Sequence, residues 1–284
     1  MRMDLSVIIP VKDDIRIRRC IESIDETVEP VIVLNTPSKD VLEIVKGLDA
    51  TVTEIEDNNL ARAYNKGIEA SSYDNMLFMD SDCTFDLKTI RKLYDGLKEA
   101  PLSKGKVEFA SNSWISKVVA LSREYHVTDI INAYSPPLAF KKSIKDDIGG
   151  MYYNDILFWT EDHEFDQRVQ KAGLNLHYDE TATIQHGELS PKADLRSSFH
   201  YGGGYFEGIK AGITQPGFMY GGNKNTLKSM GLDVLRTLSL PAFIADVTKK
   251  KNFATAVYMT AWMASFAAGY YSQACFDFLG AHKK

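Results

Sequence analysis

The sequence predicts an α/β protein with a mostly parallel sheet, followed by a helical C-terminal extension. Short apolar runs that end at polar residues alternate with segments of helical periodicity, which is typical of βαβ units. The last part of the chain has a different charge. Residues 216–284 contain eight Lys and Arg and three Asp, a net charge of +5, which leaves −10 for residues 1–215. We therefore expect one domain over residues 1–215 and a separate basic, apolar helical tail over residues 216–284.

The composition excludes some classes of protein. A net charge of −5 argues against a general nucleic-acid-binding protein. The three cysteines, Cys20, Cys83 and Cys275, lack disulfide or metal-site spacing, and such a sparse, odd number is typical of a reducing compartment. Asp4 and Pro10 interrupt the apolar stretch that a signal peptide would need. The sequence therefore predicts a cytoplasmic protein.

The first elements follow in βαβ order. Leu5–Val11 is a continuous apolar run, as expected of a parallel strand buried on both faces. A helix is expected from about Ile15 to Ile24, a second strand over Val31–Leu34, and another helix through Val41 and Val45. Right-handed crossovers would align the carboxyl ends of these strands along one edge of the sheet.

A third apolar run, Met76–Met79, ends abruptly at Asp80-Ser81-Asp82. Functional groups of open α/β sheets lie at the carboxyl ends of strands, so both carboxylates should face a crevice. Two neighbouring carboxylates repel each other unless positive charge lies between them, and oxygen ligands suit magnesium or manganese. The simpler interpretation is a turn with a helix N-cap, since Asp and Ser favour such positions.

A capped helix is expected over residues 58–72, with Asn58 or Asn59 as its N-cap and Gly67 allowing close packing. Arg62 and Lys66 lie four residues apart and therefore on one face, which is either a phosphate-binding face or a solvated basic one. Further along, we expect a helix through residues 90–97, strands at 107–110 and 118–121, and a loop over 122–138.

Thr160-Glu161-Asp162 precedes a helix predicted from about His163 to Ala172, with Thr160 as a reasonable cap. Glu161 and Asp162 suit the positive end of the helix dipole, so a purely structural role is the alternative to a chemical one. Short strands are expected at 176–178 and 183–185. His186 follows, and a lone histidine is more often a structural hydrogen-bonding residue than a ligand. Residues 198–212, with three successive glycines, resemble a mobile loop.

The tail is apolar without being strongly so. Residues 252–276 contain no charged side chain, and lysines flank them on both sides. Before them, we expect a second apolar helix pair or a broken helix over Leu232–Val247, kinked at Pro241. Two stripes repeat every four residues: an aromatic one of Tyr258, Trp262, Phe266 and Tyr270, and a small-residue one of Ala256, Thr260, Ala264, Ala268 and Ser272. Three interpretations stay open: a hairpin on a membrane surface, a dimerisation or core-packing helix, and a transmembrane span.

Four segments, in order along the chain, resemble family 2 glycosyltransferases of the GT-A fold. They are Leu5 to Asp13, Asn59 to Ile68, Asp80-Ser81-Asp82 and Thr160 to Phe165. The resemblance extends from Leu5 to about Gly212, and Asn35-Thr36-Pro37 departs from the acidic loop usual in that family. It implies a nucleotide-binding, mostly parallel sheet flanked by helices, with a donor half over about 1–100 and an acceptor half over about 101–215.

The resemblance also implies an activity: inverting transfer of a sugar from a nucleotide-diphosphate donor to a hydroxyl of a glycan or lipid-linked acceptor. Asp162 corresponds to the catalytic base, and Asp82, with His186 and Asp80, to the site of Mn²⁺ or Mg²⁺. Donor-binding positions are Pro10, Val11, Asp13, Asn35, Arg62 and Asp80. Asn35 is otherwise only a turn residue, and its amide leaves the identity of the base open.

Two other functions are compatible with part of the sequence. Phe78 to Thr84 also fits the hydrophobic-Asp-x-Asp-x-Thr signature of haloacid dehalogenase-like phosphatases, in which Asp80 would be the nucleophile. That family usually carries the signature on its first strand. A non-catalytic nucleotide-sugar-binding relative is the other alternative, and the set Asp80, Asp82 and Asp162 argues against it. The tail would add peripheral contact with the cytoplasmic face of a membrane, or a homodimer contact.

Overall fold

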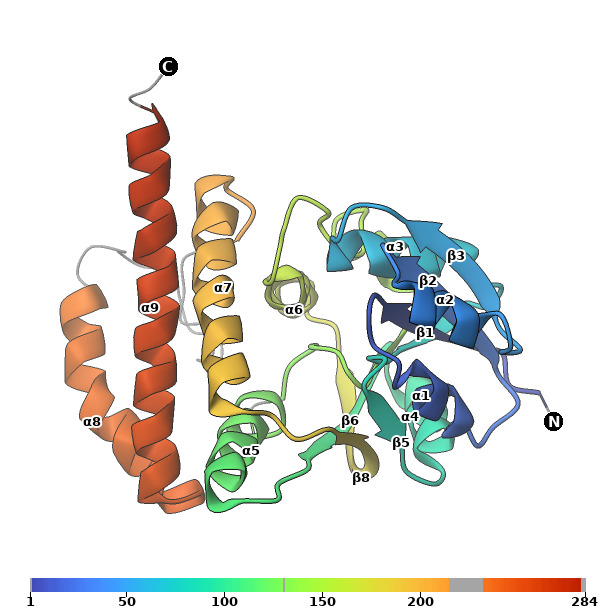
Figure 1. Cartoon of the computed structure of the whole chain (residues 1–284), viewed down its shortest axis with the longest axis horizontal. Coiled ribbons are helices and arrows are strands. Elements are labelled where there is room, and N and C mark those ends of the chain that lie inside the picture. The colour runs from blue at the N-terminus through green and yellow to red at the C-terminus, as the bar shows by residue number, and fades with distance from the viewer. Residues whose placement is uncertain (1, 130, 215–231, 282–284) are drawn as a thin grey trace. The chain divides into compact units, whose positions relative to one another are not determined.

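The computed structural model describes residues 2–129, 131–214 and 232–281, and it consists of two compact units (Figure 1). The first unit comprises Met1–Glu108 and Ile131–Gly187, and the second comprises Phe109–Ile130 and Glu188–Lys284. The second unit therefore includes segments on both sides of the boundary that the sequence suggests near residue 215. The predicted boundary near residue 215 marks the end of a catalytic domain, which compact units alone do not define. It therefore stays a prediction.

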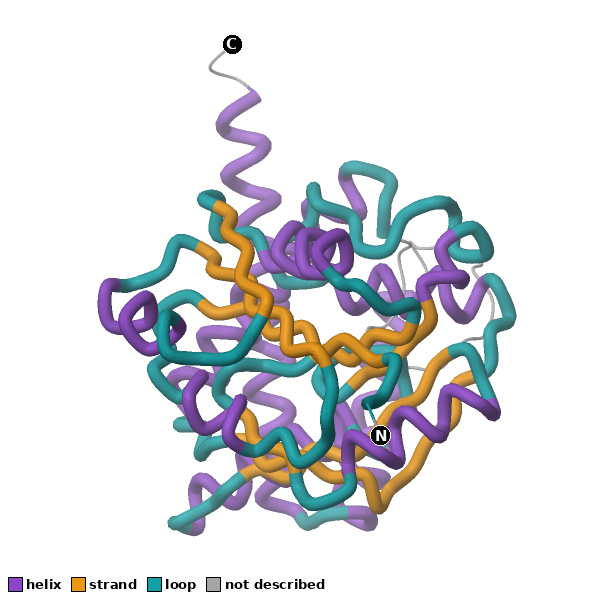
Figure 2. Tube along the Cα trace, turned by 90° about the vertical axis from the view of Figure 1, so that its right-hand side faces the viewer, coloured by secondary structure: helices purple, strands orange, loops and turns teal. Residues whose placement is uncertain are grey.

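The first unit is built on one sheet of eight described strands in the order β3-β2-β1-β4-β7-β6-β8-β5, drawn in orange in Figure 2. Strands β1 to β4 run parallel, whereas the pairs β4–β7, β6–β7 and β5–β8 are antiparallel. Their bounds are β1 Leu5–Val11, β2 Glu29–Asn35, β3 Thr51–Ile55, β4 Asn75–Phe78, β5 Cys83–Phe85, β6 Leu102–Phe109, β7 Leu138–Lys141 and β8 Leu176–His186. The mixed α/β fold class with its largely parallel sheet is confirmed.

Helices cover this sheet at the places where the apolar spacing predicts them. They are α1 Ile17–Glu22, α2 Lys39–Val45, α3 Leu60–Ala70, α4 Thr89–Glu99 and α6 Glu161–Lys171, with a short 3₁₀ helix η1 at Lys142–Lys145. The Asn59 side chain accepts the Arg62 backbone N–H at 3.0 Å and so begins α3. A Cβ at Gly67 would overlap the Ile8 side chain, so glycine lets α3 lie close to β1.

An aromatic cluster fills the space between α3, α6 and the centre of the sheet. Phe78 and Phe140 stack with ring centroids 4.9 Å apart, and Tyr153 stacks on Phe165 at the same distance. The Tyr64 ring lies 4.9 Å from the Tyr153 ring, so rings from four elements and one loop join one core. This cluster fixes the position of α6 relative to β4, and both of these elements carry candidate site residues.

The second unit is helical: α5 Trp114–Val127, α7 Pro191–Lys210, α8 Leu232–Lys250 and α9 Phe253–Ala281. Helices α7 and α9 lie side by side (Figure 1). A Cβ at Gly202 of α7 would overlap the Phe266 carbonyl, and one at Gly269 of α9 would overlap the Phe199 carbonyl. The glycines are therefore what allows these two backbones to touch.

The aromatic stripe of α9 packs within this unit. The Tyr258 hydroxyl donates to Asp194 Oδ2 at 2.7 Å, and the Tyr205 ring lies 5.7 Å from Phe266 and 6.3 Å from Tyr270. Trp262 is 1% exposed. This arrangement agrees with the core-packing interpretation of that stripe. Among the described helices, none is long and apolar enough to cross a membrane.

Several local predictions were wrong, for identifiable reasons. Residues 118–121 lie in α5, not in a strand, because Ser113 and Ser116 form a capping box that begins a helix there. Part of the predicted 122–138 loop is therefore helical too. Residues 198–210 lie in α7, where the glycines serve helix packing instead of a mobile loop. The strands predicted at 176–178 and 183–185 form the single strand β8. Residues 232–250 form one helix, α8, with Pro241 inside it, and not a helix pair, whereas the kink expected at Pro241 stays a prediction.

Candidate active site

The carboxyl ends of three parallel strands meet at one edge of the sheet. Strand β1 pairs with β2 so that Val11 lies opposite Leu34, and with β4 so that Ile8 lies opposite Phe78. The backbone N–H of Met79 donates to the Ile8 carbonyl at 3.0 Å, which keeps the chain beside β1 for one more residue. The ends of β1, β2 and β4, which carry Pro10, Asn35 and Asp80 at or next to them, therefore lie along the same edge, as the βαβ order predicts.

Asp80 lies where the chain leaves β4, and its surroundings favour the neutral carboxyl. The Tyr64 hydroxyl donates to Asp80 Oδ1 at 3.5 Å. Burial raises the pKa of Asp80 to about 7, and the charge of the neighbouring Asp82 adds to that rise. An ionised Asp80 therefore needs positive charge nearby, which fits a carboxylate that binds a cation or a ligand.

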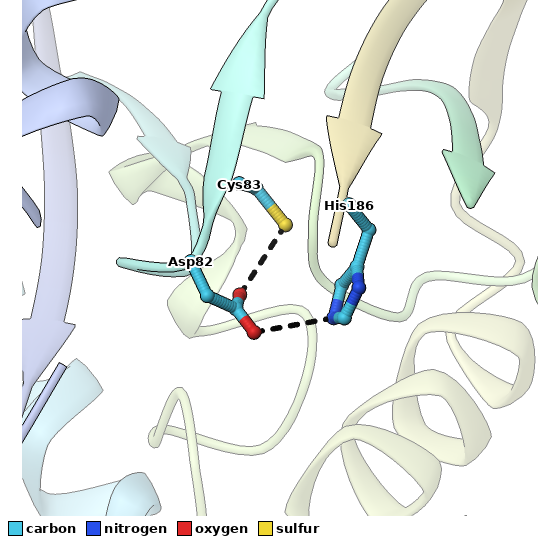
Figure 3. Close-up of side chains that lie close together, drawn as sticks. All are labelled: Asp82, Cys83 and His186. Atoms are coloured by element: carbon cyan, nitrogen blue, oxygen red, sulfur yellow. Dashed lines mark hydrogen bonds and ion pairs between the residues drawn. The ribbon is translucent and has the colours of Figure 1, made fainter. Parts of the chain in front are cut away.

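Asp82, Cys83 and His186 converge at the end of β5 (Figure 3). Cys83 of β5 lies directly opposite His186 of β8 in an antiparallel pair, so their side chains leave the sheet on the same face. Asp82 Oδ2 lies 3.3 Å from His186 Nε2, and the Cys83 thiol donates to Asp82 Oδ1 at 3.5 Å. The predicted partners Asp82 and His186 are therefore neighbours, although 104 positions separate them in the sequence.

The basic residue Arg16 also reaches this cluster. Its Nη2 lies 3.4 Å from Asp82 Oδ2, and its Nε donates to Asp14 Oδ1 at 2.8 Å. Burial alone would raise the pKa of Asp14, but hydrogen bonds from Arg16 outweigh burial and lower it. Sequence reasoning assigned no role to Arg16. The available signal was its position five residues after the end of β1, close to the edge that carries Asp80.

The residues around Asp82 fit a divalent cation. The Gly187 carbonyl can only accept, so His186 Nδ1, 2.7 Å away, carries the proton and donates to it. In the neutral imidazole, Nε2 then presents a lone pair towards the Asp82 carboxylate, an arrangement that a shared cation stabilises. Neighbouring ligands of an octahedral ion with bonds of 2.0–2.1 Å lie about 3.0 Å apart, close to the observed 3.3 Å. The Cys83 sulfur is a soft donor and therefore a poor ligand for a hard cation such as Mg²⁺ or Mn²⁺.

Asp162, the predicted base, is joined to Asp80 through two hydroxyl groups. Asp162 lies in the first turn of α6, and Ser135 Oγ lies 3.2 Å from its Oδ1. The same Ser135 Oγ lies 3.2 Å from the Tyr64 hydroxyl, which reaches Asp80. Burial raises the pKa of Asp162 well above its usual range, with further contributions from Glu161 and Asp80. Two carboxylates 82 positions apart in sequence thus belong to one cluster.

Two buried charged residues lie beside Asp162. Glu161 is 5% exposed, its Oε2 has no hydrogen-bond partner among the described residues, and burial raises its pKa to about 7. Lys104 of β6 is fully buried, and its Nζ donates to the Tyr134 carbonyl next to Ser135. Burial lowers the pKa of Lys104 to about 8, although nearby Asp162 favours its charged form. The predicted Thr160 cap is wrong, since its side chain makes no capping hydrogen bond.

Other predicted donor-site residues have different surroundings. Arg62 donates to Asp57 Oδ2 at 2.7 Å and lies 3.5 Å from Asp155. No hydrogen bond or ion pair seen among the described side chains joins it to the acidic cluster. Asn35 is buried; its Nδ2 donates to the Asn59 carbonyl at 3.4 Å, and its Oδ1 has no partner within the described part of the chain. Asp13 is exposed, just beyond β1.

Sequence reasoning did not identify Tyr64, Ser135 and Lys104 as site residues. Tyr64 was interpreted as part of the apolar stripe of α3, and its ring indeed packs in the core. Only its hydroxyl reaches the site. Ser135 and Lys104 lie in a loop and a strand without a recognisable motif. These side chains reach the site only because the fold brings β6, α3 and α6 together. No local sequence pattern indicates that these three elements are neighbours.

Residues 6–141 match the family model described as Glycosyl transferase family 2. Two solved structures titled as S. aureus TarS are similar to the chain, both with a TM-score of 0.52. The first is 18% identical over 70% of this chain and 39% of the TarS chain. The second, TarS 1–349, is 16% identical over 95% of this chain and 91% of that chain. No curated protein in the comparison matches the sequence.

At these identities the structural likeness shows the fold alone, so the chain shares the GT-A-like architecture of those structures. The phosphatase alternative is not favoured by any of these findings. The family match covers the edge that carries Asp80 and Asp82, together with β1 to β7. Residues 6–141, just under half of the chain, thus match glycosyl transferase family 2, and this match supports a glycosyltransferase activity.

Proposed function

We propose that the protein is a glycosyltransferase that moves a sugar from a nucleotide diphosphate to an acceptor hydroxyl, with inversion at the anomeric carbon and Asp162 as general base. One observation carries the proposal: Ser135 and Tyr64 connect Asp162 to Asp80 by contacts of 3.2, 3.2 and 3.5 Å. A base and a donor-side carboxylate must lie close together for a single in-line displacement, because attacking and leaving oxygens flank the same carbon.

The nucleotide would lie along the edge formed by β1, β2 and β4. Pro10, Val11 and Asp13 at the end of β1 would contact the base and ribose, and Asp80 the ribose or the cation. Asn35 supports this arrangement, because its buried Oδ1 lacks a partner among the described residues and could accept from a base edge. Arg62 would have to exchange Asp57 for the diphosphate, a ligand that its planar guanidinium suits.

Asp82 and His186, with Asp80, would hold Mn²⁺ or Mg²⁺. The 3.3 Å between Asp82 Oδ2 and His186 Nε2 and the donation of Nδ1 to Gly187 support this assignment. When bound, such a cation neutralises negative charge on the diphosphate leaving group. Arg16, 3.4 Å from Asp82, would supply further positive charge at the same place.

Asp162 would take the proton of the acceptor hydroxyl while its oxygen attacks the anomeric carbon and the bond to the diphosphate breaks. The raised pKa of the Asp162 carboxyl, caused first by burial, makes its carboxylate a stronger base than an ordinary aspartate. Ser135 would orient the carboxylate, and Lys104 would favour its ionised form. The acceptor would be a glycan or a lipid-linked sugar.

A thermal-shift screen tests this function. The protein is heated with UDP-, GDP- and dTDP-sugars, each with and without Mn²⁺, because a ligand that binds only the folded state raises the melting temperature. We expect one donor class to stabilise the protein, with a larger shift in the presence of Mn²⁺. Donors that bind equally well with EDTA would contradict metal dependence. The absence of a shift with every nucleotide sugar would contradict the proposed donor.

We also propose that the end of α9 makes peripheral contact with the cytoplasmic face of a membrane. Phe276 and Phe278 are 70% and 65% exposed, and apolar side chains so exposed are typical of interaction surfaces. Sedimentation with anionic liposomes tests this, with Phe276→Glu and Phe278→Glu expected to release the protein. If the wild type stays in solution and instead sediments as a dimer that these substitutions dissociate, the surface is a homodimer contact.

A further inference from the structure

The end of β5 carries a sulfur ligand in addition to the two groups assigned to the catalytic cation. One ligand atom from each of Asp82, Cys83 and His186 lies within 4.8 Å of the other two, and the three side chains point towards one another in Figure 3. The pairing of Cys83 with His186 across β5 and β8 makes this convergence a property of the sheet. A carboxylate, a thiol and an imidazole form a different donor set from the oxygen-rich sites of magnesium.

We propose that Asp82, Cys83 and His186 form a three-ligand site for a thiophilic divalent cation of the Zn²⁺ class. Cys83 is the ligand that distinguishes this site from the hard-cation site of the proposed function, which uses Asp82 and His186. The two cations would compete for the same carboxylate and imidazole, so Zn²⁺ would act as an inhibitor. The competition between Zn²⁺ and Mn²⁺ or Mg²⁺ rests on the proposed function. The binding of Zn²⁺ itself does not.

The two contacts of the Asp82 carboxylate have lengths close to the ligand separations of a tetrahedral ion. With bonds of 2.3 Å to sulfur, 2.0–2.1 Å to nitrogen and 2.0–2.2 Å to oxygen, ligand atoms lie about 3.4 to 3.6 Å apart. Asp82 Oδ2 lies 3.3 Å from His186 Nε2, and Cys83 Sγ lies 3.5 Å from Asp82 Oδ1. Because these contacts use different oxygens, the Asp82 carboxylate would have to rotate for one oxygen to lie near both other ligands. The fourth position would be open to water, as at zinc sites with three protein ligands.

The neighbouring groups are also those of a metal site. The Gly187 carbonyl accepts from His186 Nδ1 at 2.7 Å, which fixes the ring and directs Nε2 towards the other two ligands. The Cys83 thiol donates to Asp82, so it carries its proton when no metal is bound. Binding would form a metal–sulfur bond, break the S–H bond and release that proton to solvent, with no change of oxidation state. Mn²⁺ and Mg²⁺ prefer oxygen ligands and would leave the thiol intact.

Titration of the full-length protein with Co²⁺ tests the site without any measurement of turnover. Co²⁺ accepts the same ligands as Zn²⁺, and a cobalt–thiolate bond gives an intense near-ultraviolet charge-transfer absorption. We expect this band in the wild type, its displacement by Zn²⁺, and its loss in Cys83→Ser. Loss of a direct ligand should lower Zn²⁺ affinity by more than the roughly 10–100-fold known for second-shell substitutions.

Matched controls separate this site from other thiols. Cys20→Ser and Cys275→Ser alter a second buried cysteine and an exposed one, and both should keep the band. Circular dichroism of metal-free Cys83→Ser checks that the variant folds. A wild type without the band, or a Cys83→Ser variant that folds and keeps it, would overturn the proposal. Mn²⁺ binding, measured separately, should be unchanged in Cys83→Ser; failure of Mn²⁺ to bind the wild type would refute only the proposed hard-cation site.

Discussion

Glu161→Gln should make the protein more stable at alkaline pH and nearly as stable as the wild type at acidic pH. Burial raises the pKa of Glu161 from 4.5 to about 7, so the folded protein holds a proton that the unfolded chain releases above pH 4.5. The stability of the wild type therefore falls as pH rises from about 4.5 to about 7 and stays lower above that. Glutamine has the same shape, carries no charge and removes this dependence.

The magnitude follows from the two pKa values. The difference between a pKa of 4.5 in the unfolded chain and about 7 in the folded protein corresponds to about 3 kcal/mol of destabilisation at pH 8 and about 1 kcal/mol or less at pH 5. The Glu161 Oε2 atom has no partner among the described residues, so the amide breaks no hydrogen bond there. The substitution also relieves Asp162, whose pKa is raised first by burial and next by Glu161.

Calorimetric unfolding of the ligand-free protein in EDTA measures this effect. At about 2–4 °C per kcal/mol, the melting temperature of Glu161→Gln should exceed that of the wild type by about 6–12 °C at pH 8, and by much less at pH 5. Glu69→Gln is the matched control, because that side chain is 70% exposed in its ion pair with Lys66. The same difference in melting temperature at both pH values would refute the assignment of Glu161 as a buried acid with a raised pKa.

Three further predictions concern other parts of the chain. Ser135→Ala should lower turnover by about 2–10-fold, as expected for one hydrogen bond to Asp162; unchanged kcat would argue against orientation by this hydroxyl. Gly202→Val should destabilise the second unit by about 1–3 kcal/mol in denaturant titrations, because the valine side chain would meet the α9 backbone. Gly203→Ala is the control and should be tolerated, because its Cβ would lie 3.9 Å from the nearest atoms. Asp82→Asn should abolish Mn²⁺-dependent donor binding in calorimetry, and unchanged affinity would contradict its role as ligand.

The parallel half of the sheet was predictable because its signals are local. Buried parallel strands such as Leu5–Val11 are continuous apolar runs, and Asp80 ends the next one abruptly. Strand β3, Thr51–Ile55, was missed because it lies at the sheet edge, where exposed polar residues alternate with partly buried ones. Helix α7 was missed because its glycines, which indicate a loop by propensity, are required for contact with α9.

At the candidate site too, some residues could be predicted from local sequence motifs and others could not. Resemblance to the family supplied Asp82, His186 and Asp162, and the structure brings Asp82 and His186 within 3.3 Å of each other. Arg16 and Ser135 could not be inferred, because their place at the site depends on long-range packing and not on any motif. Burial was equally invisible in the sequence, and it is the main cause of the raised pKa values in the acidic cluster.

Comparison of turnover and donor affinity in Asp162→Asn tests the central claim most directly. Asparagine keeps the size of the side chain and its contact with Ser135, but it cannot take a proton from the acceptor. The donor site at β1, β2 and Asp82 is unaltered, so the donor dissociation constant should change little while turnover falls by about 10²–10⁴-fold. A variant with near-normal turnover would contradict the assignment of Asp162 as the base, and a variant that had lost donor affinity instead would place Asp162 in the donor site.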